Sequence, residues 1–522
     1  MGTLSCAALS IRELPSIVVQ LFERAPAPLL PGVQGPLDLC VRYLRRKPGR
    51  GLTVLYKARA LNVSRGSGRS SPDRWVSLTL GEAALAGTQI RFTASQAQQA
   101  ALEVQPPGIL MVLDLGLSVQ VFPADRGLPA LAATCTTTRG GPLFSALEAA
   151  ARLQLGDPAW SLVSAKAEPV RYKPSSRCVL RYTLLLEGAV TEGTLQHRLA
   201  LFGKVYSGPE QARTVQAQMQ HLYTEQAEKG QPILPRPLGV VENLGLTLHE
   251  AVESPEGTEP ETLRTGLHVL QPLFERGGGG EILDVVIPGE ELRMTADALA
   301  RLHTSAVRPG GPPRTGAKEA KRARERAALI AAHNPAQADV AERLAEQLAT
   351  RLEVLQPDAY RSAHGGFKAS QLLFQSQRVF VIDFDGFCLA DPALDVGYFL
   401  AYLRPSGLWY HCPGMRRWFE GAAASFVIAY RLALRERGID EPTTDGILQR
   451  TCLYEAAFLF KIATRRVNRM NSPRPGELSA MLTEIASCLS DAAHRNRAAP
   501  VTHSSSVDQR RGAGHVCLNG GI

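Results

Sequence analysis

Two carboxylates and an amide lie close together in the stretch from residue 361 to residue 400. Asp383 and Asp385 follow an apolar run in VFVIDFDG, and Gln371 ends the upstream motif HGGFKASQ. Carboxylate and amide oxygens are ligands that proteins offer to hard divalent cations such as Mg²⁺. An isolated D-x-D pair after a strand can equally be a simple turn, so the residues around the pair must decide between a metal site and a turn.

A lysine in an apolar strand is a further candidate. In LFGKVY, strand alternation places Lys204 on the same face as Phe202 and Tyr206. A lysine on an apolar face needs an anionic partner such as phosphate, whereas an edge lysine that reaches solvent is the alternative. Phosphoryl transfer needs a phosphate-binding cation, oxygen ligands for Mg²⁺ and a carboxylate that accepts the proton of the acceptor hydroxyl.

Two different structural elements must position these residues. Residues 161–256 contain strand-like segments such as VRYKPSSRCVLRYTLLLE and HRLALFGKVYS around one helical segment, which predicts a small mixed sheet with a helix. After the breaks ESPEGTEPE and RGGGGE the pattern turns helical, and we predict a helical lobe over residues 257–494. The sheet would carry Lys204, and the helical lobe would carry Asp383.

The remaining chain adds a domain and a tail. Residues 1–160 alternate as strands in LTVLYKARALNV and WVSLTL and break at RGSGRSSPD, which predicts a β-rich N-terminal domain. Residues 495–522 are polar and rich in glycine and serine, and we expect a disordered tail there. The predicted fold class is α+β.

The order of these parts resembles the aminoglycoside phosphotransferase and choline kinase family, a branch of the protein-kinase-like fold. The resemblance rests on H-G-x-x-x-x-x-Q and I-D-F-D in a helical lobe that follows a β-rich lobe, and it extends roughly from Lys166 to Asp491. It implies a bilobal fold, with residues 1–160 as a cap-like domain. It also implies phosphoryl transfer from ATP, or another nucleoside triphosphate, with Mg²⁺ to a hydroxyl of a small molecule.

The resemblance assigns nucleotide contacts to the β-rich lobe. Lys204 matches the strand lysine that binds phosphate. No G-x-G-x-x-G motif is present in the hairpin, whose turn is KPSSR, and the family also lacks that glycine loop. The backbone amides of Ser175 and Ser176 are therefore the candidate phosphate contacts.

The resemblance also assigns roles in the helical lobe. Asp383 matches the Mg²⁺ ligand, Gln371 matches the amide ligand, and Asp385 is a second ligand or a substitute base. His364 is expected to be a structural histidine of the catalytic loop. Gly366 occupies the position at which the family carries its catalytic aspartate, so this chain lacks the expected base.

The glycine leaves three hypotheses open. The chain is an active phosphotransferase in which Asp385 or a water replaces the base, a nucleotide-binding pseudokinase with a regulatory or scaffold role, or an interaction protein that binds no nucleotide. General-base catalysis contributes roughly 10² to 10⁴ in rate, so its loss alone does not abolish transfer.

The acceptor is only partly constrained. Residues 401–493, which would form the acceptor wall, contain twelve Lys and Arg against nine Asp and Glu, and Arg465, Arg466 and Arg469 are close together. A polycationic aminoglycoside would need an acidic wall, so a sugar-like acceptor is favoured. These arginines could instead lie on the outer surface.

Composition excludes several other classes. The net charge is +9, but 58 basic residues are dispersed among 49 acidic ones without aromatic interleaving, which argues against nucleic-acid binding. Nine cysteines without a C-x-x-C pair indicate no disulfide framework and fit a cytoplasmic protein. The sequence contains no apolar run long enough to predict a membrane span. The expected partners are a nucleotide and a small-molecule acceptor, with the N-terminal domain as a surface for a protein partner.

Overall fold

The computed structural model describes most of the chain. The described residues are 11–25, 37–47, 51–60, 74–86, 89–105, 108–190, 193–230, 232–253, 263–271, 286–404, 413–468 and 477–490. They form helices and sheets in separate regions, so the predicted α+β class is confirmed. The predicted disordered tail lies outside the described residues. In the described part of the chain, no helix has the length and apolar character that a membrane crossing requires.

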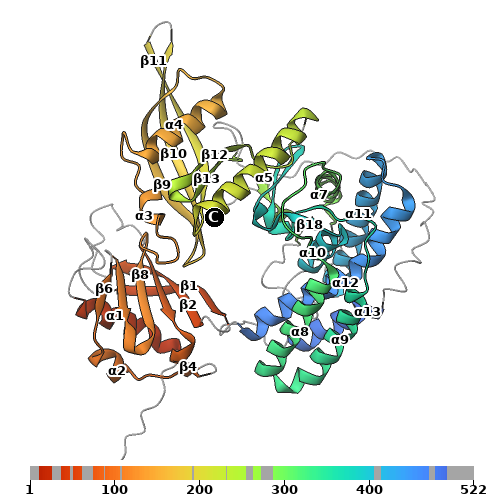
Figure 1. Ribbon diagram of the computed structural model, residues 1–522, viewed down its shortest axis with the longest axis horizontal. Helices are drawn as coiled ribbons and strands as arrows, with labels where there is room; N and C mark the ends of the chain where they lie inside the picture. The colour runs from red at the N-terminus through yellow and green to blue at the C-terminus, as the bar shows by residue number, and fades with distance from the viewer. Residues whose placement is uncertain are drawn as a thin grey trace, which may run out of the picture.

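The N-terminal region is built on a six-stranded antiparallel sheet, which we call the cap sheet (Figure 1). Its strand order is β1-β2-β3-β8-β7-β6. Helix α1 (Leu14–Arg24) buries Leu14, Ile17, Val18 and Leu21 against it, a spacing that places all four on one helix face. The strands are β1 (Leu37–Lys47), β2 (Gly51–Ala60), β3 (Arg74–Leu80), β6 (Glu103–Gln105), β7 (Ile109–Val112) and β8 (Leu117–Val121).

A second antiparallel sheet has the order β12-β13-β11-β10-β9. Alternate residues of β10 are buried on one face, from Leu180 to Leu186, as expected for a sheet with one covered side. Helix α4 (Pro142–Leu155) covers that face and packs on β9 and β12, although the predicted division at residue 160 assigns it to the N-terminal domain. The strands are β9 (Ser161–Lys173), β10 (Arg177–Val190), β11 (Gly193–Val205), β12 (Pro237–Val241) and β13 (Leu246–Glu250).

The C-terminal region is a helical lobe, on the right in Figure 1. Helix α5 (Pro209–Glu228) follows β11 and shares one hydrophobic cluster with this lobe, so it connects the second sheet to the helices. The main helices are α7 (Gly289–His303), α8 (Gly316–His333), α9 (Ala338–Glu353), α10 (Ala393–Leu403), α11 (Pro413–Glu436), α12 (Glu441–Asn468) and α13 (Glu477–Ser490). Short strands lie among them, including β15 (Arg361–Ala363), β16 (Leu372–Gln375), β17 (Arg378–Val381) and β18 (Cys388–Ala390).

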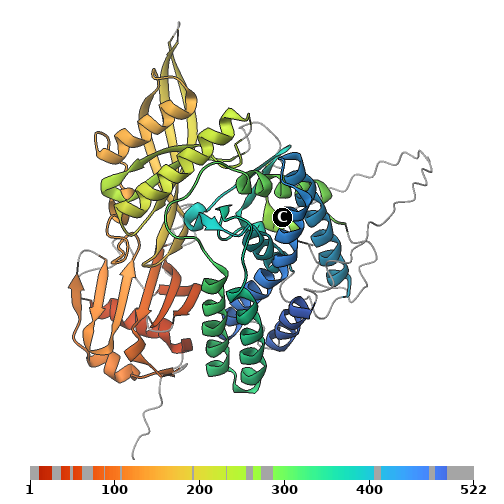
Figure 2. The same cartoon turned by 45° about the vertical axis from the view of Figure 1, so that its right-hand side comes forward.

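The cap sheet contacts both other regions, as the two ribbon views show (Figures 1 and 2). Trp75 and Phe122 of the cap sheet pack on Tyr172 of β9, with ring centroids 5.9 and 5.3 Å from the tyrosine ring. Strand β1 also contacts α12 of the helical lobe. The N-terminal region is therefore joined to the lobe that carries Lys204 and to the lobe that carries Asp383.

Candidate functional site

Lys204 contacts both predicted carboxylates where the second sheet faces the helical lobe. Its Nζ lies 2.6 Å from Asp383 Oδ1 and 2.6 Å from Asp385 Oδ1. Lys204 lies at the end of β11, whereas both aspartates follow β17. The side chains are only 12%, 23% and 20% exposed, respectively, so these ion pairs are largely shielded from water. The structure thus brings together residues about 180 positions apart in the chain.

Arg177 and Tyr206 complete this group, which we call the Asp383 cluster. Arg177 Nη1 lies 3.2 Å from Asp383 Oδ1 and 2.8 Å from Asp385 Oδ2. The hydroxyl of Tyr206 donates to Asp385 Oδ1 at 2.9 Å. Sequence reasoning did not single out either residue. The signals were the position of Arg177 at the end of the KPSSR turn and the position of Tyr206 on the Lys204 face.

The backbone at Asp383 has an unusual conformation. Its φ is 73° and its ψ is 53°, a left-handed conformation that costs a non-glycine residue roughly 1–2 kcal/mol. Strand β17 ends at Val381, so Asp383 and Asp385 both lie beyond the strand. A short 3₁₀ turn over Phe384–Gly386 orients Asp385. Such strain is typically retained where the surrounding structure requires one side-chain direction.

The cluster balances its charges. Burial raises the pKa of Asp383, but Lys204 and Arg177 lower it more, so the net pKa lies well below the ordinary value. Burial raises the pKa of Tyr206, and Asp385 raises it further. At neutral pH the Asp383 carboxylate is ionised and the phenol is protonated, so Tyr206 acts as a hydrogen-bond donor.

The residues near Asp383 fit a divalent cation with oxygen ligands. Gln371 donates from Nε2 to Asp383 Oδ2 at 3.2 Å, while its Oε1 is buried without a partner. A buried amide oxygen without a donor is costly and suits a hard metal ion. No group of three or more His, Cys, Asp or Glu residues in the described ranges could form a metal site. The oxygen donors near Asp383 are instead two carboxylates and one amide, those of Asp383, Asp385 and Gln371.

His364 supports the loop from beneath. Its backbone N–H donates to Asp395 Oδ2 at 2.6 Å, and its ring Nε2 lies 3.1 Å from the carbonyl oxygen of Ile382. Burial lowers the pKa of His364, so the ring is neutral and Nε2 carries the proton that faces this carbonyl. The ring packs on Phe384 at 4.8 Å. This arrangement fixes the loop that precedes Gln371.

The two glycines after His364 have opposite environments. Gly365 has a φ of 71°, and a Cβ there would lie 2.1 Å from the carbonyl oxygen of Gly386. A Cβ on Gly366 would meet only His364 Nδ1, at an ordinary 3.8 Å. Gly365 is required by the backbone, whereas sterics do not explain the glycine at the position of the expected catalytic aspartate.

The predicted phosphate amides have protein partners. The Ser175 N–H donates to Asp125 Oδ2 at 2.7 Å, and the Ser176 N–H donates to the carbonyl oxygen of Lys173 at 3.1 Å. Ser175 also has a positive φ of 54°. A phosphate role for either amide therefore requires the turn to rearrange.

Comparison with known proteins identifies the central part of the chain. Residues 194–438 match the profile of the phosphotransferase enzyme family. This part of the chain belongs to that family. The matched residues contain Lys204, the HGGFKASQ loop and both aspartates, so the predicted bilobal, kinase-like fold and the predicted family are confirmed. No curated protein sequence matches the chain.

Solved structures of several kinases match parts of this chain. A glucosamine kinase in complex with glucosamine, ADP and inorganic phosphate is 17% identical, with 91% of this chain and 98% of that chain covered and a TM-score of 0.41. A choline kinase from Streptococcus pneumoniae is 13% identical, with 67% and 100% covered and a TM-score of 0.38. A choline/ethanolamine kinase family protein from Mesorhizobium loti is 13% identical, with 59% and 84% covered and a TM-score of 0.35.

Helix α5 supplies no glutamate to Lys204. Gln216 is buried in the middle of the helix, and its amide pairs with the backbone of Gly239 at 3.1 and 3.2 Å. Near the helix ends, Glu210 pairs with Arg213 and Glu225 pairs with Lys229. The ion pairs that orient Lys204 are therefore those with the two aspartates.

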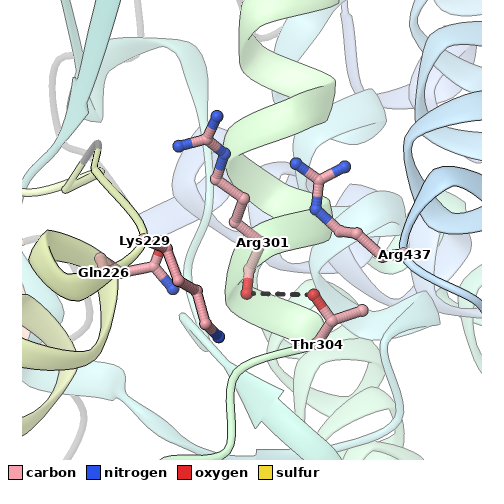
Figure 3. A pocket seen from close by; sticks show the side chains of 5 residues that line it. All are labelled: Gln226, Lys229, Arg301, Thr304 and Arg437. Carbon is pink, nitrogen blue, oxygen red and sulfur yellow. Dashed lines mark hydrogen bonds between the residues drawn. The ribbon is translucent and has the colours of Figure 1, made fainter.

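A pocket of about 380 Å³ lies elsewhere in the protein (Figure 3). It is lined by Gln226, Lys229, Arg301, Thr304 and Arg437, none of which belongs to the Asp383 cluster. Its basic side chains are already paired with carboxylates. Asp297 pairs with Arg301 at 2.8 Å and with Arg437 at 2.6 Å, and Glu225 pairs with Lys229 at 2.8 Å. This pocket therefore provides no alternative to the Asp383 cluster as a reaction site.

Proposed function

We propose that the protein is an ATP- and Mg²⁺-dependent phosphotransferase that acts on a hydroxyl of a small, sugar-like molecule. The contact of Lys204 with Asp383 and Asp385 at 2.6 Å is the observation that carries the proposal. It unites a phosphate-binding cation with carboxylates suited to a metal ion. Three donors, Lys204, Arg177 and the Tyr206 hydroxyl, lie where an incoming triphosphate could exchange with the carboxylates.

The reaction would form one bond and break one. The acceptor oxygen bonds to the γ-phosphorus, the bond from that phosphorus to the β,γ-bridging oxygen breaks, and ADP leaves. Lys204 and Arg177 would stabilise the phosphate charge, and His364 and Asp395 would hold the loop in place. Mg²⁺ held by Asp383, Gln371 and Asp385 would neutralise further phosphate charge.

The fate of the hydroxyl proton separates two candidate functions. Gly366 offers no acceptor, and Asp385 already receives Lys204, Arg177 and Tyr206. Either Asp385 or a water takes the proton in a slow phosphotransferase, or the chain is a nucleotide-binding pseudokinase. In the second case the cap sheet is a candidate surface for a protein partner.

Nucleotide binding is the first test. ATP with Mg²⁺ should raise the melting temperature of the full chain, since a ligand that binds only the folded state stabilises it. Lys204→Met and Asp383→Asn should each abolish this shift, whereas Lys321→Met, at an exposed position on α8, should leave it unchanged. No shift in the native chain by calorimetry or thermal melting would contradict both candidate functions.

Restoration of the base separates the two candidates. Gly366→Asp should fit without a clash and raise the rate of ADP release with sugar acceptors by about 10² to 10⁴. Gly366→Asn, of similar size without a basic carboxylate, is the matched control. Turnover in the native chain supports the phosphotransferase. Turnover found only in Gly366→Asp supports the pseudokinase.

A further inference from the structure

Three basic side chains of the helical lobe surround a pair of stacked tyrosines. Tyr398 and Tyr402 of α10 stack with ring centroids 4.8 Å apart. Lys461 Nζ lies 2.8 Å from the Tyr398 hydroxyl and 4.6 Å from the centroid of its ring. Lys368 Nζ and Arg465 Cζ lie 5.6 and 5.4 Å from the Tyr402 centroid. We call Lys368, Lys461 and Arg465 the basic cluster.

The basic cluster has no acidic counterpart. All three side chains are half-buried, and no described carboxylate forms an ion pair with any of them. Glu319, a buried carboxylate of the same lobe, pairs instead with Arg314, Arg322 and Arg326. Half-buried basic groups without a counter-charge lose hydration when they are protonated, so an anion beside them would restore and stabilise their charged forms.

The lowered pKa values of both lysines agree with the lack of a counter-charge in the basic cluster. Burial, together with the basic neighbours Arg465, Arg326, Arg314 and Lys368, lowers the pKa of Lys461 to about 6. Burial and then Arg465 lower the pKa of Lys368 to about 8, although Asp383 acts in the opposite direction. Each lysine is thus held in a strongly positive environment.

The basic cluster adjoins the proposed reaction site. Lys368 lies two residues after Gly366, in the loop that ends at Gln371, and it interacts electrostatically with Asp383 as well as with Arg465. Arg465 and Lys461 are one turn apart on α12. The half-buried guanidinium of Arg465 packs on Tyr402, which excludes the outer-surface alternative for this residue. The side chain of Arg466 and all of Arg469 lie outside the described residues.

We infer that the basic cluster binds an anionic group of the acceptor, a phosphate ester or a carboxylate, beside the hydroxyl that is phosphorylated. This inference rests on the proposed function. Lys204 and Arg177 lie on the two aspartates of the proposed nucleotide site, whereas Lys461 and Arg465 have no carboxylate partner among the described residues and remain for a second anion.

Paired sugars test the inference. Calorimetry on the full chain saturated with ADP and Mg²⁺ would compare glucose 6-phosphate and gluconate with neutral glucose and cationic glucosamine. At least one anionic sugar should bind ten-fold or more tightly than glucose, and the two anionic sugars distinguish phosphate from carboxylate. The inference would be overturned if glucose or glucosamine bound as tightly as the anionic sugars or more tightly. It would also be overturned if neither anionic sugar bound.

Variants locate the anion. Lys461→Gln and Arg465→Gln should each weaken the anionic sugar ten-fold or more, Arg465→Lys should restore part of the affinity, and Arg435→Gln, exposed on α11, should change nothing. Unchanged affinity in both cluster variants would overturn the inference. Binding to the basic cluster without ATP binding would refute the proposed function and leave the anion site standing. Phosphoryl transfer to glucose but to neither anionic sugar would support the proposed function and overturn the anion site.

Discussion

At the scale of single residues, the site depends on groups held in unfavourable states by their neighbours. Asp383 has a left-handed backbone, and its carboxylate is kept ionised by Lys204 and Arg177. Gln371 has a buried amide oxygen without a donor. Each of these states would be relieved by replacement or by a bound ligand, which is why single substitutions report on the site.

The adjacent glycines give the sharpest test at this scale. Gly365→Ala should lower the melting temperature strongly, because the alanine needs a positive φ and its Cβ would lie 2.1 Å from the Gly386 carbonyl oxygen. We expect a loss of about 2–4 kcal/mol in stability. Gly366→Ala is the matched control and should change stability by less than about 1 kcal/mol. Thermal melting of both variants checks this, and equal effects would show that the loop adjusts freely.

At the scale of elements, the turn between β9 and β10 is held by the N-terminal region. Asp125 is only 4% exposed and accepts from the Tyr172 hydroxyl at 2.6 Å and from the Ser175 N–H at 2.7 Å. It also accepts from the N–H of Gly127 at 2.7 Å. The same turn ends at Arg177, which contacts the Asp383 cluster. The Asp125 carboxylate therefore links the N-terminal region to the turn that carries Arg177 towards the proposed nucleotide site.

Replacement of Asp125 should loosen this turn. Asp125→Ala removes an acceptor from buried donors and should cost about 1–3 kcal/mol of stability. Amide exchange over residues 170–180 should become faster, since the Ser175 N–H loses its partner. Hydrogen exchange measured by mass spectrometry checks this against Asp114→Ala, an exposed aspartate of the same region. Unchanged exchange in Asp125→Ala would mean that the turn is held by the hairpin alone.

At the scale of the whole molecule, the described residues form three hydrophobic clusters. One lies in the cap sheet, one under the second sheet and one in the helical lobe with α5. Contacts of the cap sheet with β9 and of β1 with α12 connect them. The cations of the Asp383 cluster come from the second sheet, and those of the basic cluster come from the helical lobe.

The free-energy cost of burying Lys461 among basic neighbours should appear in the pH dependence of stability. The pKa of Lys461 is about 6 in the folded chain and near 10.5 in the unfolded chain. Between these values the unfolded chain binds more protons, so stability rises with pH across this window. Lys461→Met removes this dependence. Its melting temperature should exceed that of the native chain by about 2–4 °C or more near pH 6.5, and the difference should shrink towards pH 9.

The charged neighbours of Lys461 must be controlled in this measurement. They come from α12 itself, from α8, from the segment before α8 and from the catalytic loop, and they are Arg465, Arg326, Arg314 and Lys368. The arginines do not titrate in this range, but Lys368, with a pKa of about 8, does. Lys368→Met measured alone and with Lys461→Met separates the two contributions. A difference that grows with pH would contradict the argument.

The sequence by itself determined the features that local patterns encode. Strand alternation predicted the shared face of Lys204 and Tyr206, and the motif order predicted the family and the bilobal fold. The absence of a carboxylate at Gly366 is likewise a property of the sequence. These features are predictable because they depend on neighbours in the chain or on a fixed motif spacing.

Only the tertiary structure decided which polar and charged groups from distant parts of the chain lie together. Nothing local indicated that Arg177 contacts both aspartates, that Asp125 holds the Ser175 amide, or that Lys368, Lys461 and Arg465 surround two tyrosines. Burial and counter-charge are set by packing between segments that can be 200 residues apart. They decide whether a lysine is a surface charge or part of a binding site, and no periodicity in the chain records them.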